Sequence, residues 1–160
     1  MINVNVIAVG KLKEKYLVNG CEEYIKRLGS MCKITVVEID EYKLPDNPGD
    51  SQIEQCIEKE GKRIEERIPK SSIVIPMCIE GKEITSLELS QKIQKFAVDG
   101  ASEITFVIGG SYGLWTNIKE MGNFRLSMSK MTFPHQLARM MLLEQIYRAF
   151  SIHIGNKYHK

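Results

Sequence analysis

The sequence predicts an α/β domain with a mostly parallel sheet flanked by helices. Apolar runs of strand length alternate with stretches of helical periodicity along the 160 residues, in the order β-α-β-α-β-α-β-loop/helix-β-α. Neither repeats nor low-complexity segments interrupt this order, and no linker is long enough to divide the chain. We therefore expect residues 1–160 to form a single domain.

The composition is that of an ordinary globular protein, with 43% hydrophobic residues, 26% charged residues and a net charge of +2. Such a weak positive charge permits a nucleic-acid partner without favouring a non-specific one. The four cysteines lack the spacing of a zinc site or a redox motif, so we expect no metal and reduced, packed thiols. No signal-peptide pattern and no membrane-length apolar run are found, which predicts a cytoplasmic protein without membrane spans.

The first half of the chain opens with a strand, a helix and a second strand. Residues 2–9 change from alternation to a solid apolar run, which is typical of a strand entering a sheet core. Residues 16–28 keep one apolar face at helical spacing, and residues 34–39 form the second strand. The next stretch, residues 42–50, is rich in Pro, Asp, Asn and Gly and is therefore expected to be a loop.

Two capping boxes predict where the next two helices begin. A capping box pairs a serine or threonine with a glutamate three residues later, and each side chain bonds the other's backbone N–H. Ser51 with Glu54 has this pattern, and so does Thr85 with Glu88. The second of these helices is expected to run to about Val98.

The third strand is predicted at residues 72–79, between these two helices. Pro76 lies inside it and cannot donate to a strand ladder, which indicates a break near the strand end. Gly81 is expected to turn the chain after this strand. The fourth strand, residues 104–108, is a continuous apolar run of the kind that is buried on both faces of a sheet.

Two strand ends near the C-terminus point to a functional site. The fourth strand is followed by a glycine-rich loop at residues 109–113, and a fifth strand at residues 125–129 leads into a helix near Pro134. Ligands of open α/β sheets bind outside the carboxyl ends of the strands. We therefore expect the site where these two loops meet.

The glycine-rich loop has two interpretations that spacing alone leaves open. Glycines let a ligand approach the backbone, which favours a nucleotide or nucleoside pocket, but they also suit a plain tight turn. The loop matches neither the P-loop nor the dinucleotide fingerprint, so a triphosphate or dinucleotide is disfavoured. The polar residues after the fifth strand could contact a purine or an amino-acid moiety, or merely form a connection; they are Ser127, Ser129, Lys130 and Thr132.

The last helix and the tail carry further candidates. His135 and Arg139 are four residues apart and share a helix face, which is either a solvated edge or, for Arg139, a site for a phosphate or a partner carboxylate. The helix is apolar on much of its circumference, as in a deep core or an oligomer interface. Tyr158 and His159 follow Gly155 and are either frayed or folded over a pocket.

Four stretches of the sequence match a known family: VIGGSYGL, LSMSKMTFPHQLAR, EQIYRAF and the terminal YHK. They closely resemble a family of bacterial 23S rRNA methyltransferases in the SPOUT superfamily, whose members methylate N3 of a pseudouridine. The N-terminal stretches VIAVGKLKEKY and GCEEYIKRL also match, so the resemblance covers nearly the whole chain.

The resemblance implies that the C-terminal part of the α/β fold is threaded into a trefoil knot, where S-adenosylmethionine binds as the methyl donor. It also implies a homodimer with the C-terminal helix at the interface, and 23S rRNA in the assembled ribosome as the partner. Family members often have leucine where this chain has Met77, and Pro76 beside it is a departure. The donor contacts implied for this chain are Met77, Gly109, Gly110, Met128, Ser129, Lys130, Met131, Thr132 and Phe133.

Transfer to N3 requires the N3 proton to leave, and four residues are candidates for this part of the chemistry. A histidine has the pKa range of a general base, which favours His135 or His159. An arginine such as Arg139 could instead stabilise charge on the base carbonyls, and Tyr158 could stack on the base. The alternative function is a ribosome-binding factor that keeps the fold without the chemistry. A nucleotide-binding oxidoreductase is disfavoured because its glycine fingerprint is absent.

Overall fold

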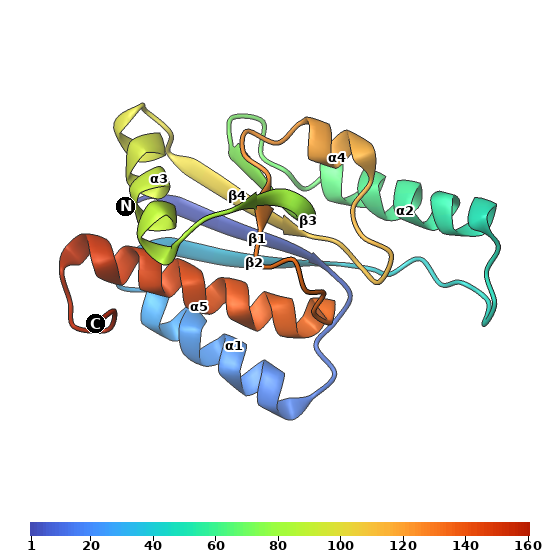
Figure 1. The fold of residues 1–160 in the computed structure, drawn as a ribbon, viewed down its shortest axis with the longest axis horizontal. Coiled ribbons are helices and arrows are strands. Elements are labelled where there is room, and N and C mark those ends of the chain that lie inside the picture. The colour runs from blue at the N-terminus through green and yellow to red at the C-terminus, as the bar shows by residue number, and fades with distance from the viewer.

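The computed structural model describes all 160 residues, which form a five-stranded parallel sheet with helices on both faces (Figure 1). The strand order is β2-β1-β4-β3-β5, so the α/β fold and the mostly parallel sheet predicted from the sequence are confirmed. The strands are β1 (Asn3–Val9), β2 (Lys33–Ile39), β3 (Ile73–Glu83), β4 (Glu103–Ile108) and β5 (Leu126–Ser127). The helices are α1 (Lys15–Leu28), α2 (Asp50–Glu65), α3 (Ser86–Val98), α4 (Thr116–Glu120) and α5 (His135–Ile154).

Alternate side chains of the central strands divide the core into two parts. In β1, Val4 and Val6 point into a core that also contains buried residues of α1, α3 and α5. Ile7 and Val9 point into a smaller core with residues of α2 and α4. The sheet therefore separates a larger layer of three helices from a smaller layer of two. None of the helices combines the length and apolarity needed to cross a membrane.

The starts of α2 and α3 test the two predicted capping boxes. The Ser51–Glu54 box is wrong: α2 already begins at Asp50, and the backbone N–H of Gly49 donates to the side-chain oxygen of Gln52 at 2.8 Å. The extended backbone of Gly49 lets it occupy the cap position, so Ser51 is already helical. At α3 the cap is confirmed, because Thr85 Oγ accepts from the backbone N–H of Glu88 at 3.1 Å.

Strand β3 is longer than predicted and changes partner at Pro76. Its pairing with β4 ends where Pro76 lies opposite Val107, and from Met77 onward the strand pairs with β5. The break expected at Pro76 is therefore the point at which β3 stops pairing with β4 and begins to pair with β5. Gly81 lies within the range of β3, but the strand bends sharply beside it, because Met77 and Lys82 both pair with Leu126.

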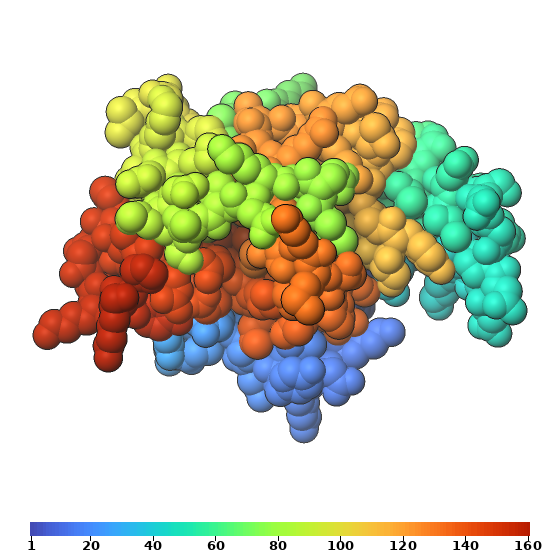
Figure 2. All heavy atoms as spheres, viewed as in Figure 1, coloured from blue at the N-terminus to red at the C-terminus, as the bar shows by residue number.

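Gly81 marks a close passage between two segments that are distant in sequence. A Cβ atom at this position would lie 2.8 Å from the backbone carbon of Leu126, so only glycine lets the two segments pass so close to each other. Figure 2 shows the end of β3, in green, directly against the segment that follows β5, in orange. Strand β5 itself has only two residues, fewer than the predicted 125–129.

Helix α5 is the longest helix of the molecule and packs against both α1 and α3 (Figure 1). The helix begins directly after Pro134, as expected from the sequence, and Gly155 ends it in the left-handed conformation at φ 75°. Much of the helix circumference is covered by the chain itself, since seven of its residues are buried: Arg139, Leu142, Leu143, Ile146, Ala149, Phe150 and Ser151.

Candidate active site

A cavity of about 930 Å³ lies where the carboxyl end of β4 meets β3 and the segment after β5. This is the edge at which the sequence predicted a site. Eight of the nine predicted donor contacts line the cavity, and Lys130 does not. The eight are Met77, Gly109, Gly110, Met128, Ser129, Met131, Thr132 and Phe133. The structure thus brings these residues together, and their role in binding stays a prediction.

The glycine-rich loop after β4 is a tight turn that also forms a cavity wall. The backbone N–H of Gly113 donates to the carbonyl of Gly110 at 3.1 Å, and Gly113 has a φ of 88°. A Cβ on Gly109 would lie 2.7 Å from the backbone of Gly113, so glycine is required there. The tight-turn interpretation is therefore confirmed, the nucleoside-pocket interpretation stays a prediction, and the turn presents Tyr112 at its tip.

The segment after β5 is fixed by its own hydroxyl groups. Ser127 Oγ donates to the backbone carbonyl of Ser129 at 3.0 Å, and Ser129 Oγ accepts from the backbone N–H of Met131 at the same distance. These two hydroxyls, which could have contacted a ligand, therefore hold the loop in shape. The loop then offers its backbone and the side chains of Met128 and Phe133 to the cavity.

His135, at the start of α5, lines the cavity and has no hydrogen-bond partner at Nε2. The nearest acid is Glu41, whose carboxylate oxygen lies 3.9 Å from His135 Nε2. Burial lowers the pKa of His135 below its usual 6.5, and the charge of Glu41 only partly opposes this shift. The ring is therefore neutral at pH 7 and can accept a proton.

Arg139 is held within the chain and does not line the cavity. Its side chain is only 2% exposed, and it donates to Glu38 at 2.6 Å and to the carbonyl of Gly10 at 2.9 Å. These bonds join α5 to the carboxyl ends of β1 and β2. The solvated-edge interpretation is excluded, and the carboxylate that Arg139 binds belongs to its own chain.

Glu60 of α2 is a buried acid that the sequence reasoning missed. It is 5% exposed and accepts the backbone N–H of Tyr42 at 3.0 Å, and burial raises the pKa of its carboxyl group. Its other oxygen lies close under the glycine-rich turn, 3.1 Å from where a Cβ of Gly110 would be. Because Glu60 lies within the charged stretch EKEGKRIEER, the sequence gives no signal that it is buried under this turn.

The C-terminal tail folds back onto α5 at the end away from the cavity (Figure 1). Tyr158 donates its hydroxyl to Glu144 at 3.1 Å, and burial raises its pKa. His159 Nδ1 lies 3.1 Å from a guanidinium nitrogen of Arg148. Glu144 comes nine residues after His135, about 13 Å along a helix. Tyr158 and His159 are thus docked rather than frayed. The structure does not bring them to the large cavity of the same chain.

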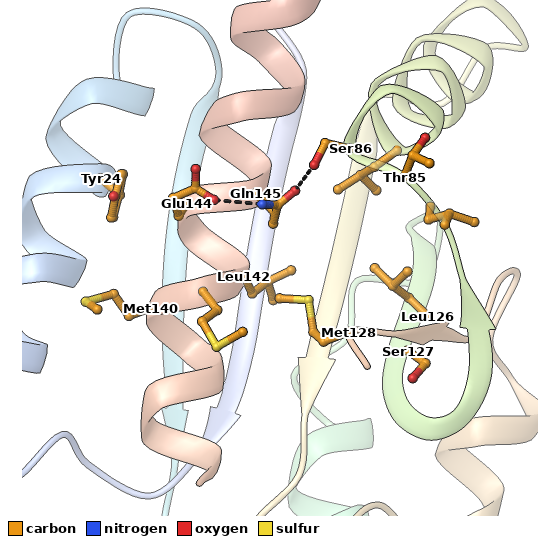
Figure 3. A pocket seen from close by; sticks show the side chains of 13 residues that line it. Tyr24, Thr85, Ser86, Leu126, Ser127, Met128, Met140, Leu142, Glu144 and Gln145 are labelled. Atoms are coloured by element: carbon orange, nitrogen blue, oxygen red, sulfur yellow. Dashed lines mark hydrogen bonds between the residues drawn. The ribbon is translucent and has the colours of Figure 1, made fainter. Parts of the chain in front are cut away.

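A second, smaller cavity of about 380 Å³ lies between α1, α3 and α5 (Figure 3). Figure 3 shows Gln145 between Glu144 and Ser86, and hydrogen bonds of 2.8 Å and 2.6 Å join the three side chains. This cavity shares Leu126, Ser127 and Met128 with the larger one. The segment from β5 to Met128 is therefore the wall between the two cavities.

An open parallel sheet with a cavity between two loops at its carboxyl edge is typical of α/β domains that bind nucleotides or cosubstrates. Residues 2–159 match the family described as "Predicted SPOUT methyltransferase". Relatives named "Ribosomal RNA large subunit methyltransferase H" are 50% identical in Leuconostoc mesenteroides and 46% identical in Listeria monocytogenes. Each alignment covers 99% of this chain and 100% of the relative.

A solved structure from Bordetella pertussis Tohama I, described as a probable methyltransferase, has the same fold. Its TM-score is 0.56 at 13% identity, and the match covers 92% of this chain and 95% of that one. The chain therefore belongs to the SPOUT methyltransferase family, and it is an enzyme of the methyltransferase class.

Proposed function

We propose that this enzyme transfers a methyl group from S-adenosylmethionine to N3 of a pseudouridine in 23S rRNA of the assembled ribosome, in the cytoplasm. The observation that supports this most strongly is the cavity: in a chain of this family, the loops after β4 and β5 line one space at the carboxyl edge of the sheet. The names of the full-length relatives support ribosomal RNA as the substrate.

The lining of the large cavity fits S-adenosylmethionine. Its volume lies within the range of small-molecule sites, and about half of its lining residues are hydrophobic, which suits an adenine ring. The turn at Gly109 brings bare backbone to the wall, where a ligand can approach closely. The bound donor supplies an activated methyl group, and this chain's residues supply position and proton transfer.

His135 is the group of this chain best placed to accept the N3 proton. It lines the cavity, is neutral at pH 7 and has a free ring nitrogen. Arg139 is committed to Glu38 and Gly10, so we assign it a positioning role, in which it fixes the helix turn that carries His135. Charge on the base carbonyls must then be stabilised by other donors.

In their docked position, the tail residues lie away from the large cavity of their own chain. We propose a homodimer in which α5 lies at the interface, so that Tyr158 and His159 of one protomer reach the cavity of its partner. Support comes from the docked tail, which lies away from its own cavity, and from the half-buried apolar residues around the second cavity, Met140, Met141 and Tyr24.

Two measurements on the purified enzyme test the proposed reaction. Calorimetry should show binding of S-adenosylmethionine, and unmodified ribosomes should incorporate a labelled methyl group. A thiol reagent tests the position of the donor, because Cys78 lines the cavity and is partly exposed while Cys21, Cys32 and Cys56 are buried. Donor should slow labelling of Cys78; unchanged labelling at saturating donor would place the donor elsewhere.

Mixing two impaired variants tests the homodimer and its tail. His135→Asn removes the proposed base, and deletion of residues 158–160 removes the tail. If the partner's tail completes the site, co-refolded mixtures should regain methylation because one site of each mixed dimer has both parts. Mixtures that stay inactive while forming mixed dimers would show that the tail acts on its own chain or not at all.

A further inference from the structure

Three exposed apolar side chains form a rim around the mouth of the large cavity. They are Ile79, Tyr112 and Met131, which are 53%, 46% and 72% exposed, and all three line the cavity. They come from three separate segments: β3, the turn after β4 and the loop after β5. Large apolar side chains exposed to water on three converging segments indicate a binding surface rather than residues exposed singly by chance.

Local hydrogen bonds fix the backbone that carries two of these exposed side chains. Tyr112 lies at the tip of the turn closed by the Gly110–Gly113 hydrogen bond of 3.1 Å. Met131 is fixed through its backbone N–H, which donates to Ser129 Oγ at 3.0 Å. The rim is therefore preorganised, and little conformational entropy is lost when a partner binds it.

Unpaired lysines flank the rim. Lys130 is the immediate neighbour of Met131, and Lys13 is held near His135 by a hydrogen bond of 2.9 Å from its backbone N–H to Gln136. Both side chains are exposed, and neither takes part in any of the seven ion pairs of the protein. Lys119, which also lines the cavity, is instead paired with Glu80.

We propose that this rim is the platform for the acceptor RNA, with an unstacked base lying on the Tyr112 ring beside Met131 and with backbone phosphates held by Lys13 and Lys130. Single-stranded RNA is recognised by a stacking ring together with cations that follow the backbone, and the rim offers both within one mouth. The assignment rests on the proposed function and names the residues that receive its substrate. A second copy of the chain is the competing occupant, but unpaired lysines favour a polyanion.

The stacking step is tested with Tyr112→Ala and the matched control Tyr112→Phe. Binding to unmodified assembled ribosomes is measured by cosedimentation without any methyl transfer, and donor affinity by calorimetry. Loss of one stacked base should weaken ribosome binding on the order of tenfold in Tyr112→Ala. Tyr112→Phe keeps the ring and should bind like the wild type, and both variants should keep donor affinity within about twofold.

The phosphate contacts are tested with Lys13→Gln and Lys130→Gln. Each should lower the slope of log affinity against log salt by about 0.7, the value for one phosphate contact on a single strand. Lys33→Gln is the matched control, because Lys33 is exposed and without an ion pair but begins β2 at the opposite edge of the sheet. Its slope should equal that of the wild type.

The other outcomes separate the platform from its alternatives. Equal losses of donor and ribosome affinity in Tyr112→Ala would make the rim part of the donor site. A variant that sediments as a monomer with unchanged ribosome affinity would show that a second copy covers the rim. Wild-type protein that fails to bind ribosomes would also refute the platform. Ribosome binding that depends on Tyr112, without any methylation, would instead uphold the platform and refute the proposed reaction.

Discussion

The two ends of helix α5 carry the same pair of residue types in opposite surroundings. At the first end, His135 lines a cavity and Arg139 is buried against the carboxyl edge of the sheet. At the other end, Arg148 is a quarter exposed, pairs with Glu144 and contacts His159 of the tail. One end is fixed to the sheet, and the other binds the short C-terminal tail, which can detach from the helix.

This difference separates roles that residue type alone cannot. An arginine with two partners inside its own chain has a structural role, because releasing it would leave Glu38 and a buried carbonyl unpaired. A histidine that lines a cavity and whose buried Nε2 has no hydrogen-bond partner can take part in chemistry. The tail is docked on α5 through contacts of Tyr158 and His159, and the proposed homodimer exchanges it between chains.

The largest expected effect comes from His135→Asn, which keeps a polar ring-sized group but cannot accept the proton at neutral pH. We expect methylation of ribosomes at saturating donor to fall by about a hundredfold or more, the contribution of a general base. His153→Asn is the matched control, because His153 is exposed near the other end of the same helix. Similar activity in the two variants would remove His135 from the mechanism.

Arg139→Met should give the next largest effect, on stability. It removes charged hydrogen bonds to Glu38 and Gly10, and we expect the free energy of unfolding to fall by about 3 kcal/mol in urea titrations. Arg148→Met, at the exposed end, should cost about 1 kcal/mol. Equal costs at both ends would contradict the contrast between them.

Deletion of residues 158–160 should leave the fold and donor affinity intact, because the tail docks on the outside of α5. We expect the methylation rate to fall on the order of tenfold, as for loss of an acid–base or stacking group. Deletion of Lys160 alone is the control. A parallel loss of donor affinity would mean that the tail supports the cavity structurally, and an unchanged rate would mean that it has no part in the reaction.

The smallest effect concerns pH and again compares the two ends of the helix. Burial holds the pKa of His135 below 6.5, so the unfolded chain binds a proton more readily than the folded one. The stabilising contribution of neutral His135 is complete above pH 6.5 and falls as the pH drops toward the lowered pKa. His135→Asn should therefore flatten the decline of the urea midpoint between pH 7.5 and 5.5, whereas His153→Asn should not.

Sequence reasoning located the fold and the edge of the sheet that carries the cavity because both depend on local patterns. Buried strands, glycines after β4 and the polar segment after β5 are all visible in short windows. The partners of Arg139 were not predictable, since Glu38 and Gly10 lie 101 and 129 residues away in sequence. The close approach at Gly81 was not predictable for the same reason: the backbone that it accommodates belongs to Arg125 and Leu126.

The capping error at α2 has a local cause. Ser51 and Glu54 match the pattern of a capping box, but the preceding Gly49 and Gln52 also fit the backbone requirement and begin the helix two residues earlier. The placement of Tyr158 and His159 failed differently. A sequence shows that a tail can move, but it does not show which surface of the protein the tail packs against.

The bond between Arg139 and Gly10 has a consequence for how the protein is made. Its two partners are 129 residues apart, and β1 also pairs along its length with β4 from the second half of the chain. During synthesis β1 therefore cannot complete its contacts until segments from the second half of the chain have left the ribosomal exit tunnel. Contacts between residues so distant in sequence form slowly. A nascent chain completes its cavity only as its last helix emerges, and a chain cut short before α5 leaves its central strands uncovered.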